Sequence, residues 1–341
     1  LAVLIGLAVT AVGVPATRWL VELFGAGPEV TDAAATYLRI ALFGAVPMLV
    51  MLATTGVIRG LQDTKTPMVV AVAGNIVNVV LNLLLVYGLD FGIAGSAVGT
   101  LIAESGSALA LWLMVARAAR TQGVNLRFSL AGVRNAGGAG IPLILRTATL
   151  RACLLIMTFA GASIGDNDLA ALQVAMVIWN FLAYALDAIA IAAQAITGRA
   201  LGAGDLDYAK RITTREIQWG VASGVVTGLG LAALSPVLGP LFTGDPDVQR
   251  LLVPVLLVAA ATQPIAGVVF VLDGVLIGAG DGRYLAWAGL VVLIVFAPFA
   301  WLATAGGITW LWVAFGAAFI GGRAVALTLR ERSNAWLRPG A

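Results

Sequence analysis

The chain of 341 residues contains no histidine, a single cysteine (Cys153) and only 11% charged residues. Soluble domains carry about 25% charged residues, so the composition excludes a soluble globular enzyme, a disordered protein and a nucleic-acid-binding domain. One cysteine without histidine also excludes an internal disulfide, a Cys/His zinc site, a histidine-dependent triad and c-type haem. We therefore expect no enzymatic activity, no catalytic residues, no metal site and no cofactor.

Hydrophobic residues make up 60% of the chain and gather in long runs. A membrane-spanning helix needs about 20 apolar residues, which predicts about ten spans. They lie near residues 1–21, 33–58, 66–87, 93–116, 138–162, 168–197, 215–238, 249–279, 284–304 and 307–329. The last two share an uncharged run, and we expect a break between them at Ala305-Gly306-Gly307. The alternating segments of a β-barrel are absent, so the sequence predicts an all-α polytopic membrane protein.

The segments between the spans alternate in charge. One set is basic and contains Arg59 to Lys65, Arg117, Arg120, Arg127, Arg134, Arg199, Lys210, Arg211, Arg215, Arg283, Arg330, Arg332 and Arg338. The other set is acidic and contains Glu22, Glu29, Asp32, Asp90, Asp166, Asp168, Asp245 and Asp247. Basic loops remain in the cytoplasm. We therefore expect a multi-pass protein of the bacterial inner (cytoplasmic) membrane with a cytoplasmic C-terminus.

Several groups of residues recur at a constant offset. Leu23-Phe24, Pro28 and Val30 return as Leu241-Phe242, Pro246 and Val248, where 241 − 23 = 218. The same offset relates Gly56-Val57, Gly60, Asp63 and Lys65 to Gly274-Val275, Gly278, Asp281 and Arg283. Gly92-Ile93 match Gly307-Ile308 at 307 − 92 = 215. Three matches in order indicate a duplicated unit, arranged as the parallel repeats found in transporters.

The duplication predicts two pseudo-symmetric six-helix lobes, the first of them incomplete. We divide the chain into an N-terminal lobe (1–117), a cytoplasmic linker (118–137), a C-terminal lobe (138–330) and a cytoplasmic tail (331–341). Spans 138–162 and 168–197 open the second half, and their counterparts would precede Leu1 because 138 − 218 = −80. We therefore expect two further helices before Leu1, contained in about 80–100 additional residues.

Three acids inside the spans are candidate coupling sites: Glu104, Asp187 and Asp273. A charge at membrane depth costs about 2.5–3.5 kcal/mol and is usually functional. Each acid has a structural alternative, since Glu104 could bond a neighbouring serine or helix and Asp273 could cap or snorkel near a helix end. Arg146 and Arg151 enter span 138–162 as charge partners. We expect Arg146 to snorkel and the deeper Arg151 to pair with an acid.

Span 168–197 carries the clearest polar pattern. Gln173, Asn180, Asp187 and Gln194 follow one another at seven-residue intervals. Seven residues are two helical turns with a small drift, so the four side chains share one face. Tyr184 lies one turn from Asn180 and from Asp187. The pattern predicts a cavity lining, with interhelical hydrogen bonding as the alternative.

A second polar face lies on span 66–87. Asn75, Asn78 and Asn82 are spaced by three and four residues and therefore share a face of this helix. The pattern is equally typical of hydrogen-bonded packing and of a substrate cavity. We treat the three asparagines as candidate cavity residues.

Four segments closely resemble one transporter family. The run Ile178–Ala195, followed by Gly198-Arg199 and Gly202-Ala203-Gly204-Asp205, resembles the eighth helix of MATE (multidrug and toxic compound extrusion) transporters. Arg59–Pro67 resembles the loop between helices four and five, Gly92–Ala97 the entry to helix six, and Asp273–Asp281 the end of helix ten. The resemblance extends along the whole chain, as helices three to twelve, and is greatest to the DNA-damage-inducible F (DinF-like) branch.

The resemblance implies a two-lobe, V-shaped, monomeric antiporter of twelve helices. Such transporters export amphipathic, often cationic organic compounds in exchange for H⁺ or Na⁺. In the DinF-like branch a carboxylate on the first helix is a main proton site, and that helix is absent here. Asn75, Asn78 and Asn82 would remain from that lobe's polar cluster, whereas Asp187 fits the pattern of the branch directly.

The resulting hypothesis is a protonation switch at Asp187. We expect Asp187 to be buried and to bind a proton at neutral pH. Protonation would alter its bonds to Tyr184, Asn180 or Arg151. The two lobes would then shift between inward-facing and outward-facing states, of which the substrate prefers one.

The expected partners are the lipid bilayer and a small organic cation as substrate, which the rings of Trp179, Phe181 and Tyr184 would hold; no nucleic acid is expected. One rival function is a flippase of the same superfamily for lipid-linked oligosaccharides or lipid II. It requires a cationic cavity, for which Arg146 and Arg151 are the candidates. Another rival is a membrane scaffold or a non-functional truncated remnant.

Overall fold

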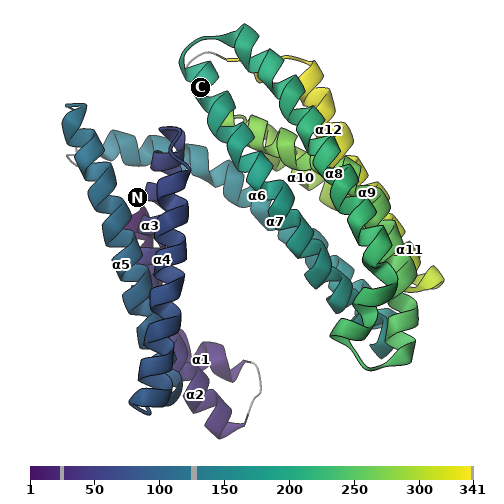
Figure 1. Ribbon diagram of the computed structural model, residues 1–341, viewed down its shortest axis with the longest axis horizontal. Coiled ribbons are helices and arrows are strands. Elements are labelled where there is room, and N and C mark those ends of the chain that lie inside the picture. Colours follow the sequence, from purple (N-terminus) through teal and green to yellow (C-terminus); the bar gives the residue numbers. More distant parts are fainter. Residues whose placement is uncertain (24–26, 124–128, 339–341) are drawn as a thin grey trace. The chain divides into compact units, whose positions relative to one another are not determined.

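The computed structural model describes residues 1–23, 27–123 and 129–338, and over these residues all regular structure is helical (Figure 1). Nine of the described helices are long and apolar enough to cross a membrane. The last of them, Gly282–Arg332, reverses direction at Gly307, where φ is +77°. This break confirms the predicted turn and divides the segment into two helical rods. The predicted all-α membrane fold is therefore confirmed.

The chain forms two compact units, Leu1–Ala136 and Gly137–Ala341. In the first unit α5 packs against α2, α3 and α4, while α1 packs against α2 and α3. Its helices are α1 (Ala2–Glu22), α2 (Pro28–Ala41), α3 (Ala45–Gly60), α4 (Lys65–Asn82) and α5 (Gly92–Thr121). A short turn, η1 (Leu42–Gly44), joins α2 to α3, and a π-helical turn, η2 (Leu83–Gly88), extends α4.

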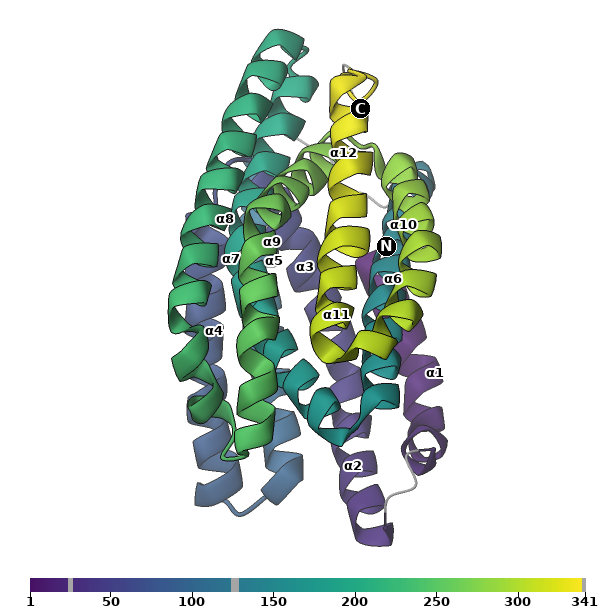
Figure 2. The same ribbon diagram turned by 90° about the vertical axis from the view of Figure 1, so that its right-hand side faces the viewer.

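The second unit is built around α9, which packs against α7 on one side and α8 on another (Figures 1 and 2). The α10–α12 hairpin completes it, with α12 beside α10 in Figure 2. The helices are α6 (Leu130–Ile164), α7 (Asp166–Gly202), α8 (Leu206–Phe242), α9 (Pro246–Gly278), α10 (Gly282–Ala303), α11 (Gly307–Ala314) and α12 (Gly322–Arg332). The 3₁₀ turn η3 (Thr304–Gly306) precedes α11, and the π-helical turn η4 (Phe315–Gly321) joins α11 to α12.

An aromatic cluster lies in the core of the second unit. Phe315 lies at its centre, with ring centroids 5.2 Å from Trp179, 5.4 Å from Trp312 and 4.8 Å from Phe319. Two of these pairs meet edge to face, the arrangement that aromatic quadrupoles favour. The cluster fixes η4 against α7 and thereby sets the direction in which α12 leaves the turn.

The turns repeat at the offsets of the sequence duplication. Gln62 and Gly280 are 218 residues apart, and both have positive φ, at 65° and 70°. Gly92 and Gly307 are 215 residues apart, and their φ values are 54° and 77°. Glycine, which has no β-carbon, adopts this conformation readily, and residues with a side-chain amide do so occasionally. The duplication is therefore visible in backbone geometry as well as in residue identity.

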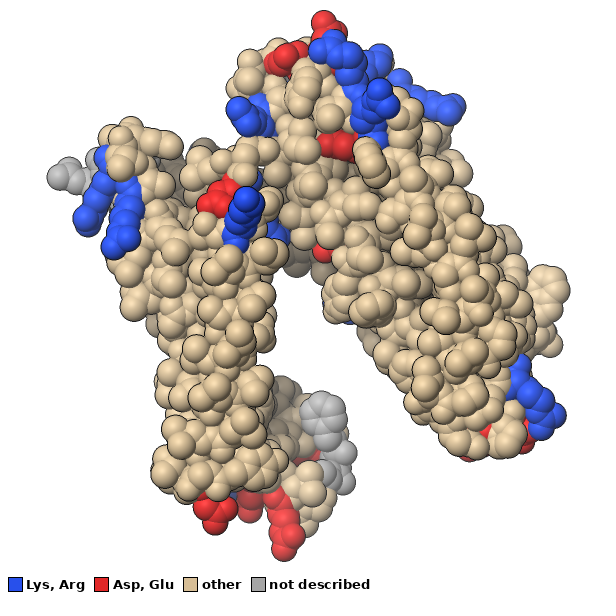
Figure 3. Space-filling view, viewed as in Figure 1, with Lys and Arg blue, Asp and Glu red and all other residues tan. Residues whose placement is uncertain are grey.

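Charged side chains gather at the helix ends of each unit taken by itself (Figure 3). In the first unit chain order places Glu22, Glu29 and Asp90 toward one end and Arg59 and Arg117 toward the other. Apolar side chains cover the length between the ends. This separation is what a bilayer requires, because charges are stable only where water or headgroups reach them.

Glycines bring α8 and α9 into backbone contact. A Cβ atom built at Gly267 would lie 2.0 Å from the carbonyl oxygen of Gly220, and one at Gly224 would lie 2.4 Å from that of Gln263. One built at Gly228 would lie 2.6 Å from the carbonyl oxygen of Ala260. Lipid tails are as apolar as the side chains, so the hydrophobic effect does not drive helices together inside a bilayer. Small residues stabilise such contacts by letting the helices pack closely.

Gly267→Ala should therefore destabilise the second unit by about 1–3 kcal/mol, because the added methyl group overpacks a rigid backbone contact. The measurement is unfolding in detergent micelles, compared with wild type. Gly230→Ala is the matched control on α8, since a Cβ atom there meets nothing within 4 Å. It should be neutral or stabilising by about 0.5–1 kcal/mol. Equal stability of the two variants would refute backbone contact between α8 and α9.

Candidate functional site

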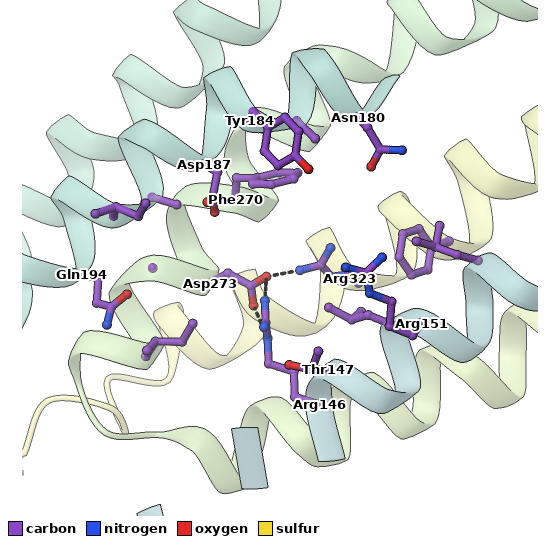
Figure 4. Close-up of a pocket in the computed structure, with 18 of the residues that line it drawn as sticks. Arg146, Thr147, Arg151, Asn180, Tyr184, Asp187, Gln194, Phe270, Asp273 and Arg323 are labelled. Atoms are coloured by element: carbon purple, nitrogen blue, oxygen red, sulfur yellow. Dashed lines mark hydrogen bonds and ion pairs between the residues drawn. The ribbon is translucent and has the colours of Figure 1, made fainter. Parts of the chain in front are cut away.

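A pocket of about 300 Å³ opens within the second unit, with polar side chains set in a largely apolar lining (Figure 4). Its walls come from α6, α7, α9 and the η4–α12 segment. The charged and amide residues that line it are Arg146, Arg151, Asn180, Asp187, Gln194, Asp273 and Arg323. Tyr184 and Phe270 add aromatic surface. A pocket with convergent polar groups in an apolar lobe is the usual form of a ligand site.

Asp273 is held between two arginines from different helices. Arg146 Nη2 lies 2.5 Å from Asp273 Oδ2, and Arg146 Nε donates to Oδ1 at 3.3 Å. Arg323 Nη2 donates to the same Oδ2, so α6, α9 and α12 meet at one carboxylate. Asp273 is 6% exposed and Arg323 is 8% exposed. Charge-assisted bonds of this kind are about twice as strong as neutral ones.

Two features of the local sequence place these groups. Gly274 and Gly278 allow α7 close to α9, since Cβ atoms there would lie 2.1 Å and 2.4 Å from the carbonyl oxygens of Ala190 and Gln194. The π-helical turn η4 then alters the helical register before Arg323. The Arg323 guanidinium carbon lies 5.6 Å from the centre of the Phe319 ring, which supports it from one side.

The predicted polar stripe of α7 is divided by the structure. Asn180, Tyr184, Asp187 and Gln194 line the pocket, whereas Gln173 is exposed and does not. Asn180 Nδ2 donates to the carbonyl oxygen one turn earlier at 2.7 Å. The later part of the polar stripe therefore forms a wall of the pocket, and its first turn, at Gln173, is exposed outside the pocket.

The predicted aromatic residues also differ in their surroundings. Trp179 borders the pocket but is 6% exposed, and its ring packs on Phe315 in the core. Phe181 is exposed and lies outside the pocket lining, whereas Tyr184 lines the pocket and is 74% exposed. Tyr184 is thus the ring of the three that is available to a ligand in the pocket.

Two expectations about charge are wrong in this structure. Asp187 is exposed rather than buried, although it borders the pocket. Arg146 forms the acid pair that was expected of Arg151. Arg151 lines the same pocket (Figure 4) but is exposed, and it has no ion pair with any described residue. Tertiary packing, and not depth along the span, decides which arginine is paired.

The first unit brings its own candidates to three cavities, of which one of about 540 Å³ is lined by Asn78 and Asn82. Glu104 is half-buried on α5 and borders cavities of about 290 and 250 Å³, the second of which also includes Asn75 and Asn78. Asn78 Nδ2 donates to Thr100 Oγ1 of α5 at 3.0 Å, and Asn82 Nδ2 donates to Asn78 Oδ1 at 3.1 Å. The asparagines therefore bond α4 internally and to α5 while also facing a cavity. Their role in binding stays a prediction.

Arg323 is the site residue that sequence reasoning missed. It ends the uncharged run 284–322, and an isolated charge at that position of a span indicates function or pairing.

Within the described ranges no group of three acid or cysteine side chains could hold a metal ion. The polar groups of the pocket are thus guanidinium, carboxylate and amide groups, set among aliphatic and aromatic residues.

Comparison with known proteins gives a consistent result. A family model described as MatE matches residues 1–84 and 142–302. The chain is 32% identical over 310 residues to Protein DETOXIFICATION 44, chloroplastic, of Arabidopsis thaliana, covering 88% of this chain and 56% of that protein. It is 32% identical over 267 residues to DNA damage-inducible protein F of Escherichia coli (strain K12), covering 76% and 57%. The chain spans about half the length of the curated relatives it matches.

Solved structures share the fold. A MATE transporter of Vibrio cholerae superposes with a TM-score of 0.87 at 20% identity, covering 97% of this chain and 78% of that one. A MOP superfamily transporter from Pyrococcus furiosus gives 0.87 at 20% identity, covering 98% and 77%, and is described as having a binding pocket of reverse polarity. At this identity the likeness establishes the arrangement of helices alone.

Asp273→Asn should lower the free energy of unfolding by about 3–5 kcal/mol, because it leaves the buried Arg323 and the partly buried Arg146 without a counter-ion. Thermal or denaturant unfolding in micelles measures the loss. Arg151→Gln is the control within the same pocket, and it should change stability by about 0.5 kcal/mol or less. An Asp273→Asn protein as stable as wild type would contradict the observed Arg–Asp–Arg cluster.

Proposed function

The chain belongs to the MATE family of membrane transporters, and on this premise we propose that it serves a secondary antiporter that exports amphipathic organic compounds by alternating access. The observation that supports this function is the pocket of the second unit. Charged and amide groups from four helical segments converge there within a membrane-spanning lobe. Ionisable groups at membrane depth are costly, and they persist where they bind substrates or ions.

Asp187 is the proposed coupling residue, with H⁺ as the coupling ion and Na⁺ as the alternative. Protonating Asp273 would leave Arg146 and Arg323 unpaired, which makes it a poor carrier. Asp187 lines the same pocket and is exposed toward it. An ion and a substrate can therefore compete at Asp187 directly, and competition at one site is the simplest basis for exchange.

The proposed substrate is a planar, amphipathic cation. Tyr184 offers an exposed ring beside the Asp187 carboxylate, and Phe270 adds a second apolar surface. A ring face and a negative charge together favour an organic cation. Transport in this form needs no cofactor and no metal, and we propose that the protein works as a monomer in the bacterial cytoplasmic membrane with its C-terminus in the cytoplasm.

A flippase for lipid-linked, anionic substrates is the second candidate, and Arg323 is the observation that favours it. The pocket lining contains three guanidinium groups and two carboxylates, which gives 3 − 2 = +1. A net positive pocket attracts phosphate or carboxylate headgroups. The reverse-polarity pocket of the Pyrococcus furiosus relative shows that the fold accepts different charge patterns.

Asp187→Asn should reduce dye export to the level of cells without the transporter, because the neutral amide cannot release and rebind a proton. The measurement is efflux of a cationic dye from cells that express the native gene, with surface expression checked by immunoblot. Asp166→Asn is the control, since it makes the same change at the exposed start of α7. Wild-type export by Asp187→Asn would refute the coupling role. Export restricted to anionic dyes would favour the flippase.

A further inference from the structure

One buried acid lies outside the pocket. Glu216 is 7% exposed on α8, within a stripe of small or apolar residues that faces the interior. Neither Oε1 nor Oε2 has a hydrogen-bond partner, and no ion pair forms at this side chain within the described ranges. The stripe contains Ala209, Thr213, Gly220, Gly224, Gly228 and Leu231.

The glycine contacts fix what Glu216 faces. Along α8, Gly228, Gly224 and Gly220 meet the carbonyl oxygens of Ala260, Gln263 and Gly267 on α9. Each step of four residues toward the start of α8 thus corresponds to about four residues toward the end of α9. One further step places Glu216 opposite the turn of α9 that contains Val271, a wholly buried segment. This register places Glu216 at the α8–α9 interface, and its 7% exposure means that the side chain is enclosed there.

The charged groups of the surrounding helices are engaged or distant. On α9 the Asp273 carboxylate bonds Arg146 and Arg323, while Asp247 and Arg250 lie at the opposite end of the helix and pair with each other. On α7, Asp187 lines the pocket and Arg199 belongs to the last turn.

On α8 itself the neighbouring cations point away from the interface. Arg215 is exposed and donates to Gln218 at 3.5 Å, and Lys210 and Arg211 are exposed near the start of the helix. No cation of α7, α8 or α9 thus compensates a negative charge on Glu216.

We propose that Glu216 is a proton-binding site inside the α8–α9 interface, and that release of its proton loosens this interface. A carboxylate without a partner is far more costly to bury than a neutral carboxylic acid. The observed packing therefore belongs to the protonated form. Release of the proton to water leaves a charge that must be hydrated, and hydration requires α8 to move from α9 because the glycine contacts leave no room for water. The site is separate from the pocket and does not depend on the proposed transport activity.

Infrared spectroscopy of the full chain in liposomes, with ¹³C-labelled glutamate, tests the protonation state. The label confines the shifted carboxyl band to five residues, Glu22, Glu29, Glu104, Glu216 and Glu331. At neutral pH we expect a C=O band of a protonated, weakly bonded acid that is absent from Glu216→Gln and retained in Glu104→Gln. A spectrum of wild type with carboxylate bands alone would overturn the proposal, and this result needs no variant to fold.

The pH dependence of unfolding tests the link to packing. A proton held in the folded state and lost in the unfolded state makes the unfolding constant rise about tenfold per pH unit above the unfolded group's titration range. Glu216→Gln should remove this slope, because the amide is neutral at every pH. Asp207→Asn, on an exposed residue of the same helix, should retain it. Equal slopes in wild type and Glu216→Gln would overturn the proposal, whatever the export assays show.

Discussion

Close backbone contact at α9 is the constraint on which the second unit depends. Its glycines meet carbonyl oxygens of α7 at Gly274 and Gly278 and of α8 at Gly267. Inside a bilayer, lipid tails are as apolar as the side chains, so helices gain stability mainly from close packing and interhelical hydrogen bonds. The layer formed by α7, α8 and α9 is therefore held together by close packing. A single methyl group added at its centre would destabilise it.

This layer explains why charge is distributed as it is. Because α7 approaches α9 at Gly274, the neighbouring Asp273 lies at a pocket wall beside Asp187. An acid at that depth requires compensation, which α6 and α12 supply through Arg146 and Arg323. The other face of α9 meets α8, where glycines leave space for backbone alone. Glu216 of α8 lies at this interface, and it has no counter-ion. One helix thus separates a fully paired acid from one without a partner.

Features that depend on local composition can be predicted from the sequence. Contacts between segments that are far apart in the chain cannot. The spans, the break at Gly307 and the shared face of Asn180, Asp187 and Gln194 follow from apolar length, glycine and helical period. The partner of Asp273 does not, because Arg323 is 50 residues away and reaches it only through the altered register of η4. The burial expected of Asp187 fails for a related reason, since periodicity identifies a polar face without showing which helix covers it.

Three acids of the second unit, Asp187, Glu216 and Asp273, differ in what a proton would change. A carrier must exist both protonated and ionised at modest cost. Asp273 fails this condition, because its neutral form would leave the buried Arg323 and the partly buried Arg146 unpaired. Asp187 meets it through its exposure to the pocket, so its charge responds to what the pocket contains. Glu216 meets it only if α8 and α9 separate, so its charge responds to packing. If both titrate, the lobe has one proton site that senses ligand and another that senses conformation. Coupling then requires only that the same helix movement alter both, and α9 contacts the helices that carry each of them.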